Sequence, residues 1–249
     1  MIEYNTYYMF EIVYFIVSFI ILVYFSIMIF RIIRFILYSQ KTFSNTKAFS
    51  REIKNTRQHI LILGDSSMYG AGIKMSENTI GGLFAKKYPI ATIETLAVNG
   101  AKVRDLEKQL KNKKYKFYDI ILIGIGANDI IQFSNFNSLR TDLITIIKKV
   151  HKIGNKIILC HSVNIGNLGF YIFPFDYVFD NRTRKLSRIY AELETKFSNL
   201  IYVNFYRKRG NDYYDKITRK KFIAEDGIHP NDYANKYFFD IILNELQKI

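Results

Sequence analysis

The chain has 249 residues, of which 49% are hydrophobic and 16% aromatic, and only three are proline, so it is long and apolar enough to fold rather than stay disordered. Its single cysteine, Cys160, lies in an apolar run and is expected to be buried and inert; it excludes an internal disulfide framework and a cysteine-based zinc site. The net charge is +14, and the whole excess lies in residues 41–249, which suits binding to anionic lipid headgroups, acidic substrates or nucleic acid. No nucleic-acid-binding motif is present, so nucleic acid is not expected as a partner.

The first 38 residues predict a transmembrane anchor. Ile12 to Phe30 is a run of 19 residues without a charge, which at ~1.5 Å per residue spans a hydrocarbon core of ~30 Å. A cleavable signal peptide is shorter and has basic residues in front, whereas this front is acidic. We therefore expect one uncleaved, single-pass helix that crosses the membrane through residues 12–37.

The charges around this helix predict its orientation. Seven Lys and Arg residues follow the apolar run and none precedes it, so the positive-inside rule predicts that the rest of the chain lies in the cytoplasm. Residues 39–58 are polar and are expected to form a tether to a domain at 59–249.

Strand and helix patterns alternate after the tether. Apolar runs predict strands at residues 60–63, 92–98, 119–125, 156–163 and 200–205, and amphipathic patterns predict helices at residues 77–87, 102–112, 138–152, 182–197 and 232–246. This alternation is typical of an α/β fold in which helices cover both faces of a parallel sheet of about five strands. The aromatic segment 164–181 does not fit the alternation and is expected to be a loop that shapes a substrate site.

The first strand ends at Gly64-Asp65-Ser66-Ser67, where glycine permits a sharp turn. Three interpretations of this turn are open. Asp65 or Ser66 caps a helix, the glycines and hydroxyls bind a phosphate, or a serine acts as a nucleophile. The phosphate interpretation is weak because neither Gly-Lys-Ser/Thr nor GxGxxG is present.

Polar residues follow other strand ends at the same edge of the predicted sheet. Gly100 follows the second strand, Asn128 and Asp129 follow the third, and Asp226 and His229 precede the last helix. Acyl transfer needs a base, an acid that orients the base, and donors for the developing oxyanion. His229 can supply the base, Asp226 the acid, and Asn128 a donor, with the backbone N–H groups of Ser66 and Gly100. Asp65 and Asp129 are expected to organise the loops.

These four blocks, in this order, resemble the SGNH (GDSL-type) hydrolases over residues 60–248. The resemblance implies a three-layer, flavodoxin-like αβα sandwich and an enzyme that needs no metal or other cofactor. It also implies Ser66 as the nucleophile, Asp226 and His229 as the rest of a triad, and Ser66, Gly100 and Asn128 as the oxyanion hole. His161 is expected to support the site or to line its pocket, whereas His59 and His151 are expected to be structural.

The resulting hypothesis is a membrane-anchored esterase or lipase-like acyl hydrolase. The anchor, the basic charge and the aromatic loop favour an ester or thioester substrate of lipid-like character. The alternatives are an acyltransferase on the same fold, a catalytically silent membrane scaffold, and a nucleotide- or flavin-binding module.

Overall fold

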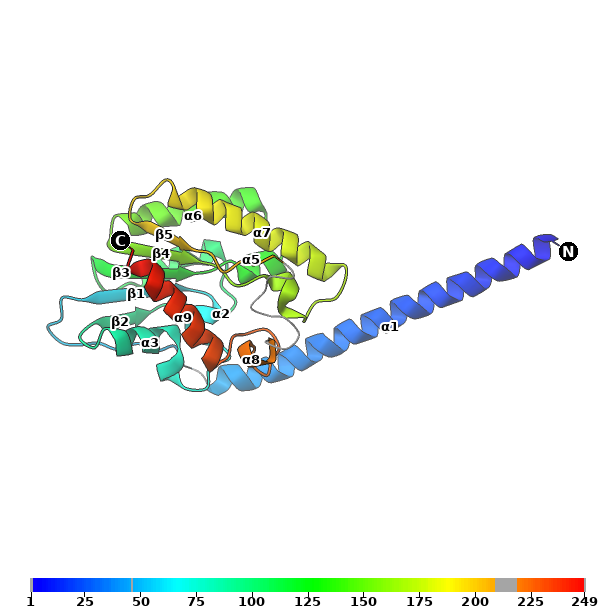
Figure 1. Ribbon diagram of the computed structural model, residues 1–249, viewed down its shortest axis with the longest axis horizontal. Helices are drawn as coiled ribbons and strands as arrows, with labels where there is room; N and C mark the ends of the chain where they lie inside the picture. Colours follow the sequence, from blue (N-terminus) through cyan, green and yellow to red (C-terminus); the bar gives the residue numbers. More distant parts are fainter. Residues whose placement is uncertain (1, 46, 209–218, 249) are drawn as a thin grey trace.

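The computed structural model describes residues 2–45, 47–208 and 219–248 and contains one α/β domain preceded by a long helix (Figure 1). The five strands form one parallel sheet in the order β2-β1-β3-β4-β5, as predicted. The strands are β1 (His59–Gly64), β2 (Thr92–Thr95), β3 (Tyr118–Gly124), β4 (Gly154–Cys160) and β5 (Leu200–Val203). Because all the strands run the same way, their carboxyl ends meet at one edge, where ligands bind in open α/β sheets.

Helices cover both faces of the sheet, so the fold is the expected three-layer sandwich. Figure 1 shows α6 and α7 on one side and α3 and α9 on the other. The α-helices of the domain are α2 (Ser66–Tyr69), α3 (Ile80–Lys87), α4 (Leu106–Lys111), α5 (Ala127–Ile131), α6 (Phe136–His151), α7 (Phe175–Glu194), α8 (Arg219–Phe222) and α9 (Asp232–Leu246). Short 3₁₀ helices lie at η1 (Ser76–Asn78), η2 (Val103–Asp105) and η3 (Ile165–Leu168).

The apolar runs of the sequence occupy the centre of this sandwich. Ile60 to Leu63 in β1 and Ile120 to Ile123 in β3 are each at most 6% exposed. A strand covered on both faces needs apolar residues at every position, which is why these runs do not alternate with polar residues. This packing holds the carboxyl ends of β1 and β3 in register, since Gly64 pairs with Gly124.

The predicted aromatic loop is shorter than expected. Helix α7 begins at Phe175, seven residues before the predicted start at Arg182, so residues 175–181 are helical and the expectation of a loop through Asn181 is wrong. Asp176, Phe179 and Thr183 are buried at helical spacing and extend the buried face of α7 towards its amino end. Among the aromatic residues of this helical part, Phe179 is buried, whereas Phe175 and Tyr177 are exposed.

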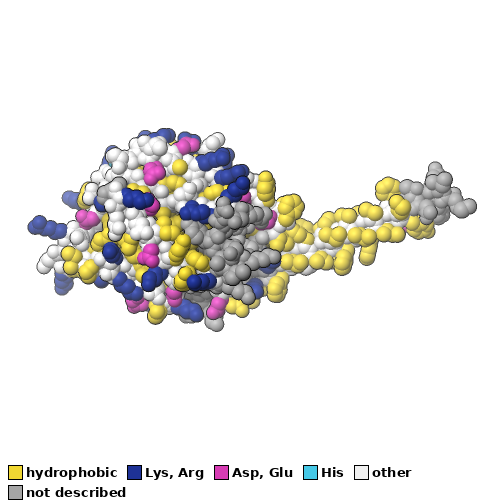
Figure 2. Space-filling model, viewed as in Figure 1, with side chains coloured by type: hydrophobic (Ala, Val, Ile, Leu, Met, Phe, Trp, Pro, Cys, Tyr) yellow, Lys and Arg dark blue, Asp and Glu magenta, His cyan; other side chains and the backbone are white. Residues whose placement is uncertain are grey.

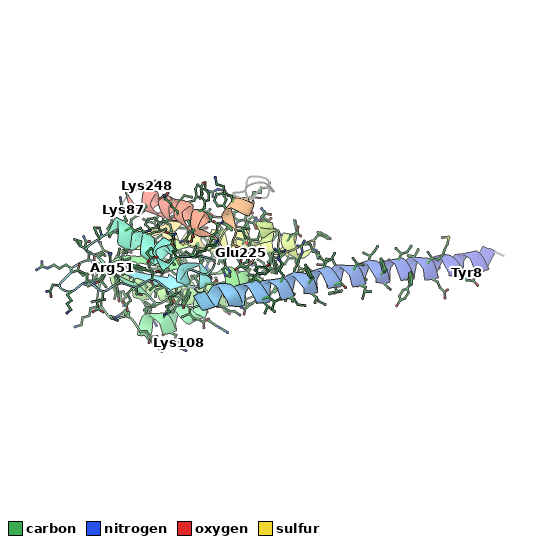
Figure 3. The ribbon with its side chains drawn as sticks, turned by 90° about the horizontal axis from the view of Figure 1, so that it is seen from below. Tyr8, Arg51, Lys87, Lys108, Glu225 and Lys248 are labelled. Atoms are coloured by element: carbon green, nitrogen blue, oxygen red, sulfur yellow. The ribbon has the colours of Figure 1, made fainter. Side chains whose placement is uncertain are left out.

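Helix α1 (Ile2–Asn45) contains the predicted anchor. Its segment Tyr8–Tyr38 is long and apolar enough to cross a membrane. Figure 3 shows Tyr8 far from the domain, whereas the other end of α1 lies along it. The helix continues seven residues into the predicted tether, and residue 46 lies outside the described residues.

Residues 49–51 of the predicted tether are bonded to the sheet edge. Arg51 forms an antiparallel bridge with Ile93 in β2, and its guanidinium donates hydrogen bonds to the carbonyl oxygens of Tyr88 (2.8 Å) and Ala91 (3.0 Å). Thr95 donates a further bond to the carbonyl oxygen of Phe49 (2.6 Å). The boundary at residue 59 stays a prediction, and residues 49–51 contribute contacts to the edge strand that precedes Gly100.

Candidate active site

The chain turns sharply at the end of β1. Gly64 has a φ of +145°, and a Cβ atom there would lie 2.0 Å from the carbonyl oxygen of Gly124, so no other residue fits. Asp65 then caps α2, because its Oδ1 accepts hydrogen bonds from the Ser67 backbone N–H (3.0 Å) and hydroxyl (2.7 Å). The Ser67 hydroxyl is thus used within the turn, which leaves Ser66 as the serine that faces the site.

Asp65 is a structural carboxyl group in this arrangement. It is 2% exposed, and burial raises its pKa above the ordinary value, although the bonds from Ser67 oppose that shift. The same turn therefore contains both a helix cap, formed by Asp65, and a serine, Ser66, whose hydroxyl is not used by that cap. Capping by Asp65 and a nucleophilic Ser66 do not exclude each other.

Gln109 in α4 forms two hydrogen bonds with the backbone of Gly64 in the same turn, a role that the sequence analysis did not predict. Its amide Nε2 donates to the Gly64 carbonyl oxygen (2.8 Å), and its Oε1 accepts from the Gly64 N–H (2.9 Å). Strand β2 ends at Thr95, and beyond it the Val98 N–H still donates to the Gly64 carbonyl oxygen, while the side chain of Gln109 accepts from the Gly64 N–H. In the sequence, the only sign of this role is that Gln109 lies next to Leu110 and three residues after Leu106, on what becomes the buried face of α4. Which face of α4 is buried becomes clear only once the helix is packed against the sheet.

His229 joins Ser66 to Asp226. The distance from His229 Nε2 to Ser66 Oγ is 2.9 Å, and that from His229 Nδ1 to Asp226 Oδ2 is 2.7 Å. Asp226 Oδ1 accepts hydrogen bonds from the N–H groups of Ile228 and His229, each at 3.0 Å. The structure thus brings together three residues that are separated by up to 163 positions in the chain.

The environment of Asp226 favours its ionised form. Burial alone would raise its pKa, but the hydrogen bond and charge of His229, together with the two backbone N–H donors, outweigh burial, and the pKa lies below the ordinary value. An ionised Asp226 accepts a hydrogen bond from the Nδ1–H of His229, which leaves Nε2 as the nitrogen that faces Ser66.

Gly72 allows the histidine loop to come this close. Its φ is +89°, and a Cβ atom there would lie 2.4 Å from the Pro230 carbonyl oxygen and 2.9 Å from His229 Cβ. Any side chain at position 72 would push the loop that carries His229 away from Ser66.

Two of the residues predicted for the oxyanion hole, Ser66 and Asn128, line the cavity, whereas the third, Gly100, does not. Asn128, in α5 directly after β3, borders the same cavity as Ser66, and its Nδ2 donates to the Ala101 carbonyl oxygen (3.0 Å). Asp129 accepts from the Val103 N–H (3.0 Å), so it organises the loop after β2. Gly100 lies in that loop with a φ of +77°, exposed, and is not among the described residues that line the cavity.

The cavity beside Ser66 has a volume of about 550 Å³, within the range of small-molecule sites. Ser66, Asn128 and His229 are among its polar lining residues. Its remaining wall is mainly apolar, and includes Ile131, Leu168, Phe170, Phe179, Phe205 and Phe238. A mainly apolar cavity that is also lined by a serine and a histidine suits a ligand with an apolar chain and one reactive polar group.

His161, at the end of β4, also lines this cavity. Its Nε2 lies 2.7 Å from the Tyr202 hydroxyl, and its Nδ1 contacts the Ser162 carbonyl oxygen. Burial lowers the pKa of His161 to about 4, so the ring is neutral at pH 7. His161 therefore supports the cavity wall through Tyr202 and does not contact Ser66 among the hydrogen bonds of the described residues.

The remaining expectations concern two other histidines, the cysteine and a metal site. His59 stacks on Tyr115, and His151 packs against Phe197, both away from the cavity. Cys160 is buried, and burial raises the pKa of its thiol to about 12. Within the described parts of the chain, no group of three or more His, Cys, Asp or Glu side chains is placed to hold a metal ion.

A parallel αβα sandwich with these polar residues at the carboxyl edge of its sheet is the architecture of the GDSL-type hydrolases. Residues 62–237 match the family described as GDSL-like Lipase/Acylhydrolase, and this match covers more than half of the chain. The chain therefore belongs to the GDSL-like lipase/acylhydrolase family, which confirms the resemblance found in the sequence. No curated protein sequence matches the chain.

Solved structures share the fold at low sequence identity. A phospholipase A1 from Streptomyces albidoflavus has a TM-score of 0.59 at 10% identity, and the alignment covers 76% of this chain and 100% of that one. An extracellular lipase from Streptomyces rimosus has a TM-score of 0.56 at 15% identity, covering 76% and 99%. A lipolytic G-D-S-L family protein from Veillonella parvula has a TM-score of 0.54 at 16% identity, covering 77% and 100%. These similarities show the fold.

Proposed function

We propose that this protein is a membrane-anchored serine hydrolase that cleaves carboxylic esters, with Ser66, His229 and Asp226 as its triad. The observation that carries the proposal is the continuous hydrogen-bonded series from Ser66 Oγ through both nitrogens of His229 to Asp226, in which Ser66 and His229 line a mainly apolar cavity. A serine, a base and an orienting acid in this geometry are what acyl transfer requires. Membership of a lipase/acylhydrolase family supports the same reaction class.

In this mechanism Ser66 Oγ attacks the ester carbonyl carbon while His229 Nε2 takes the hydroxyl proton. Asp226 stabilises the imidazolium ion that forms. The N–H of Ser66 at the start of α2, the second amide hydrogen of Asn128 and the N–H of Gly100 are the proposed oxyanion donors. His229 then gives its proton to the departing alcohol, and an acyl group remains on Ser66.

Water completes the reaction. His229 accepts a proton from the water as it attacks the acyl carbon, and the carboxylic acid leaves when Ser66 regains its proton. If an alcohol entered instead of water, the same residues would carry out acyl transfer. A salicylyl-acyltransferase shares the fold at 16% identity, which by itself shows only the fold. Product analysis with and without an added alcohol therefore belongs in the assay.

The membrane part of the proposal rests on Tyr8–Tyr38, and the Lys and Arg residues after it support a cytoplasmic domain. A reporter fused after Ile249 should therefore signal from the cytoplasm. A signal from the opposite side of the membrane would overturn this orientation.

A fluorophosphonate probe tests the nucleophile on the full chain in detergent. Wild type should be labelled and should hydrolyse short p-nitrophenyl esters, whereas Ser66→Ala should lose both by several orders of magnitude. Ser67→Ala is the matched control, because its hydroxyl bonds to Asp65 within the turn, and it should still be labelled. Equal labelling of wild type and Ser66→Ala would refute the serine mechanism.

A further inference from the structure

One face of the anchor helix is covered by the domain. In Tyr8–Tyr38, the partly buried side chains are Tyr24, Met28, Arg31 and Phe35, and the others are exposed. These four are separated by four, three and four residues, so they lie on one side of α1. Helix α1 therefore contacts the domain along a defined stripe near its carboxyl end, rather than only through its connection to β1.

This stripe contacts both the segment before α7 and the proposed catalytic histidine. Arg31 Nη1 donates to the carbonyl oxygens of Gly169 (3.1 Å) and Phe170 (2.7 Å). The Phe35 ring packs edge-to-face on Phe170, with centroids 5.7 Å apart, and lies nearly parallel to the His229 ring at 6.4 Å. The anchor helix thus lies directly beside the reacting groups.

Three side chains of α1 form part of the cavity wall. Met28, Ile32 and Phe35 line the same cavity as Ser66 and His229. Ile32 is also 44% exposed, so the cavity reaches the molecular surface beside α1. The wall that α1 provides is apolar, which matches the rest of the cavity.

The length of α1 places this wall at the membrane surface. Tyr8–Tyr38 has 31 residues and is about 46 Å long at ~1.5 Å per residue. Counted from Ile12, where the uncharged run begins, a hydrocarbon core of ~30 Å uses about 20 residues and ends near Arg31. Met28 therefore lies at the end of the core, and Ile32 and Phe35 lie just beyond it. Arg31 is the first charged residue after the apolar run, as expected where a helix leaves the bilayer.

The domain presents further apolar surface on the same side. Phe173 and Tyr177, next to the segment that Arg31 binds, are 75% and 58% exposed. In Figure 2 hydrophobic side chains continue from α1 onto the adjoining edge of the domain. An exposed apolar patch beside a transmembrane helix fits contact with lipid.

We propose that Met28, Ile32 and Phe35 of the anchor helix form the membrane-side wall of the acyl pocket, and that the substrate is an ester lipid of the bilayer whose acyl chain reaches Ser66 along α1. This inference rests on the proposed function for the reaction and extends it to the substrate class and its route. The anchor is then part of the active site as well as a means of attachment.

Chain-length selectivity tests the wall. Ile32→Trp adds bulk inside the cavity, whereas Ile33→Trp adds the same bulk on the exposed face of α1, where Ile33 is 50% exposed. With the full chain in detergent, the ratio of kcat/KM for a C12 to a C4 p-nitrophenyl ester should fall at least tenfold in Ile32→Trp and stay at the wild-type value in Ile33→Trp. A ratio unchanged in both variants, or lowered equally in both, would overturn the inference.

A binding experiment separates this inference from the catalytic proposal. The full chain carrying Ser66→Ala is placed in phosphatidylcholine vesicles that contain a phospholipid with a diazirine at the end of one acyl chain. Illumination should crosslink the lipid to cavity residues of the domain, such as Phe179 and Phe238, and adding Ile32→Trp should reduce these crosslinks while Ile33→Trp does not. Crosslinks confined to residues 8–27 would refute the route along α1, even if Ser66 is the nucleophile. If wild type hydrolyses no ester but the domain crosslinks appear, the lipid site stands and the proposed reaction fails.

Discussion

Gln109 tests whether the turn before Ser66 depends on support from α4. Gln109→Leu keeps a side chain of similar size and removes both hydrogen bonds to Gly64. The two backbone groups respond differently. The Gly64 carbonyl oxygen retains the Val98 N–H at 3.0 Å, whereas no other hydrogen bond described in the structure pairs the Gly64 N–H.

The magnitude follows from this asymmetry. A buried donor without a partner costs about 1–3 kcal/mol, and the second hydrogen bond contributes about 0.5–1.5 kcal/mol. Gln109 is 3% exposed, so water does not replace either partner without a structural change. The free energy of unfolding should therefore fall by about 2–4 kcal/mol, which in a domain of this size lowers Tm by roughly 5–15 °C.

Calorimetry or circular dichroism of the full chain in detergent measures this change, and Lys108→Leu is the control. Lys108 is the neighbouring residue in α4 and lies at the surface (Figure 3), so its replacement should change stability by less than about 0.5 kcal/mol. If Gln109 also holds Ser66 in position, kcat on a short ester should fall in Gln109→Leu while KM stays the same. A Tm within about 1 °C of wild type would refute the assigned role of Gln109, since that shift corresponds to well under 1 kcal/mol.

Three further predictions concern the proposed active site and its cavity. Asn128→Ala should lower kcat by ~10²–10³ with little change in KM, because it removes one oxyanion donor; a normal kcat with a lowered Tm would assign Asn128 only its bond to Ala101. Asp226→Asn should lower kcat by at least ~10², because an amide facing His229 favours the wrong tautomer, and stopped-flow acylation kinetics should show the loss. His161 has a folded-state pKa of about 4 against an ordinary 6.5, so the unfolded chain binds more protons below pH 6.5, and about 3 kcal/mol of stability should be lost as the pH falls from 6.5 towards 4. His161→Gln should flatten this part of the stability–pH curve measured by denaturant titration, and an unchanged slope would contradict the assignment.

The elements of the sheet were predictable because burial on both faces leaves a local signature. Strands covered by helices need apolar residues at consecutive positions, and the runs at Ile60–Leu63 and Ile120–Ile123 meet that need without reference to any other part of the chain. The start of α7 was not predictable in the same way. Asp180 and Asn181 look like turn residues, yet they are helical because Phe179 and Thr183 are buried on either side of them.

The sequence by itself determined which residues follow each strand, and a parallel sheet brings all such residues to one edge. That rule was enough to group Ser66, Asn128 and His229 before any distance was known. Only the tertiary structure decided which neighbours complete the site. The support of Gly64 by Gln109 and the contact of Phe35 with His229 join residues 45 and 194 positions apart. Such contacts depend on how α4 and α1 pack against the rest of the domain. A local pattern of polar and apolar residues shows which face of a helix is buried, but it does not show which residues that face contacts.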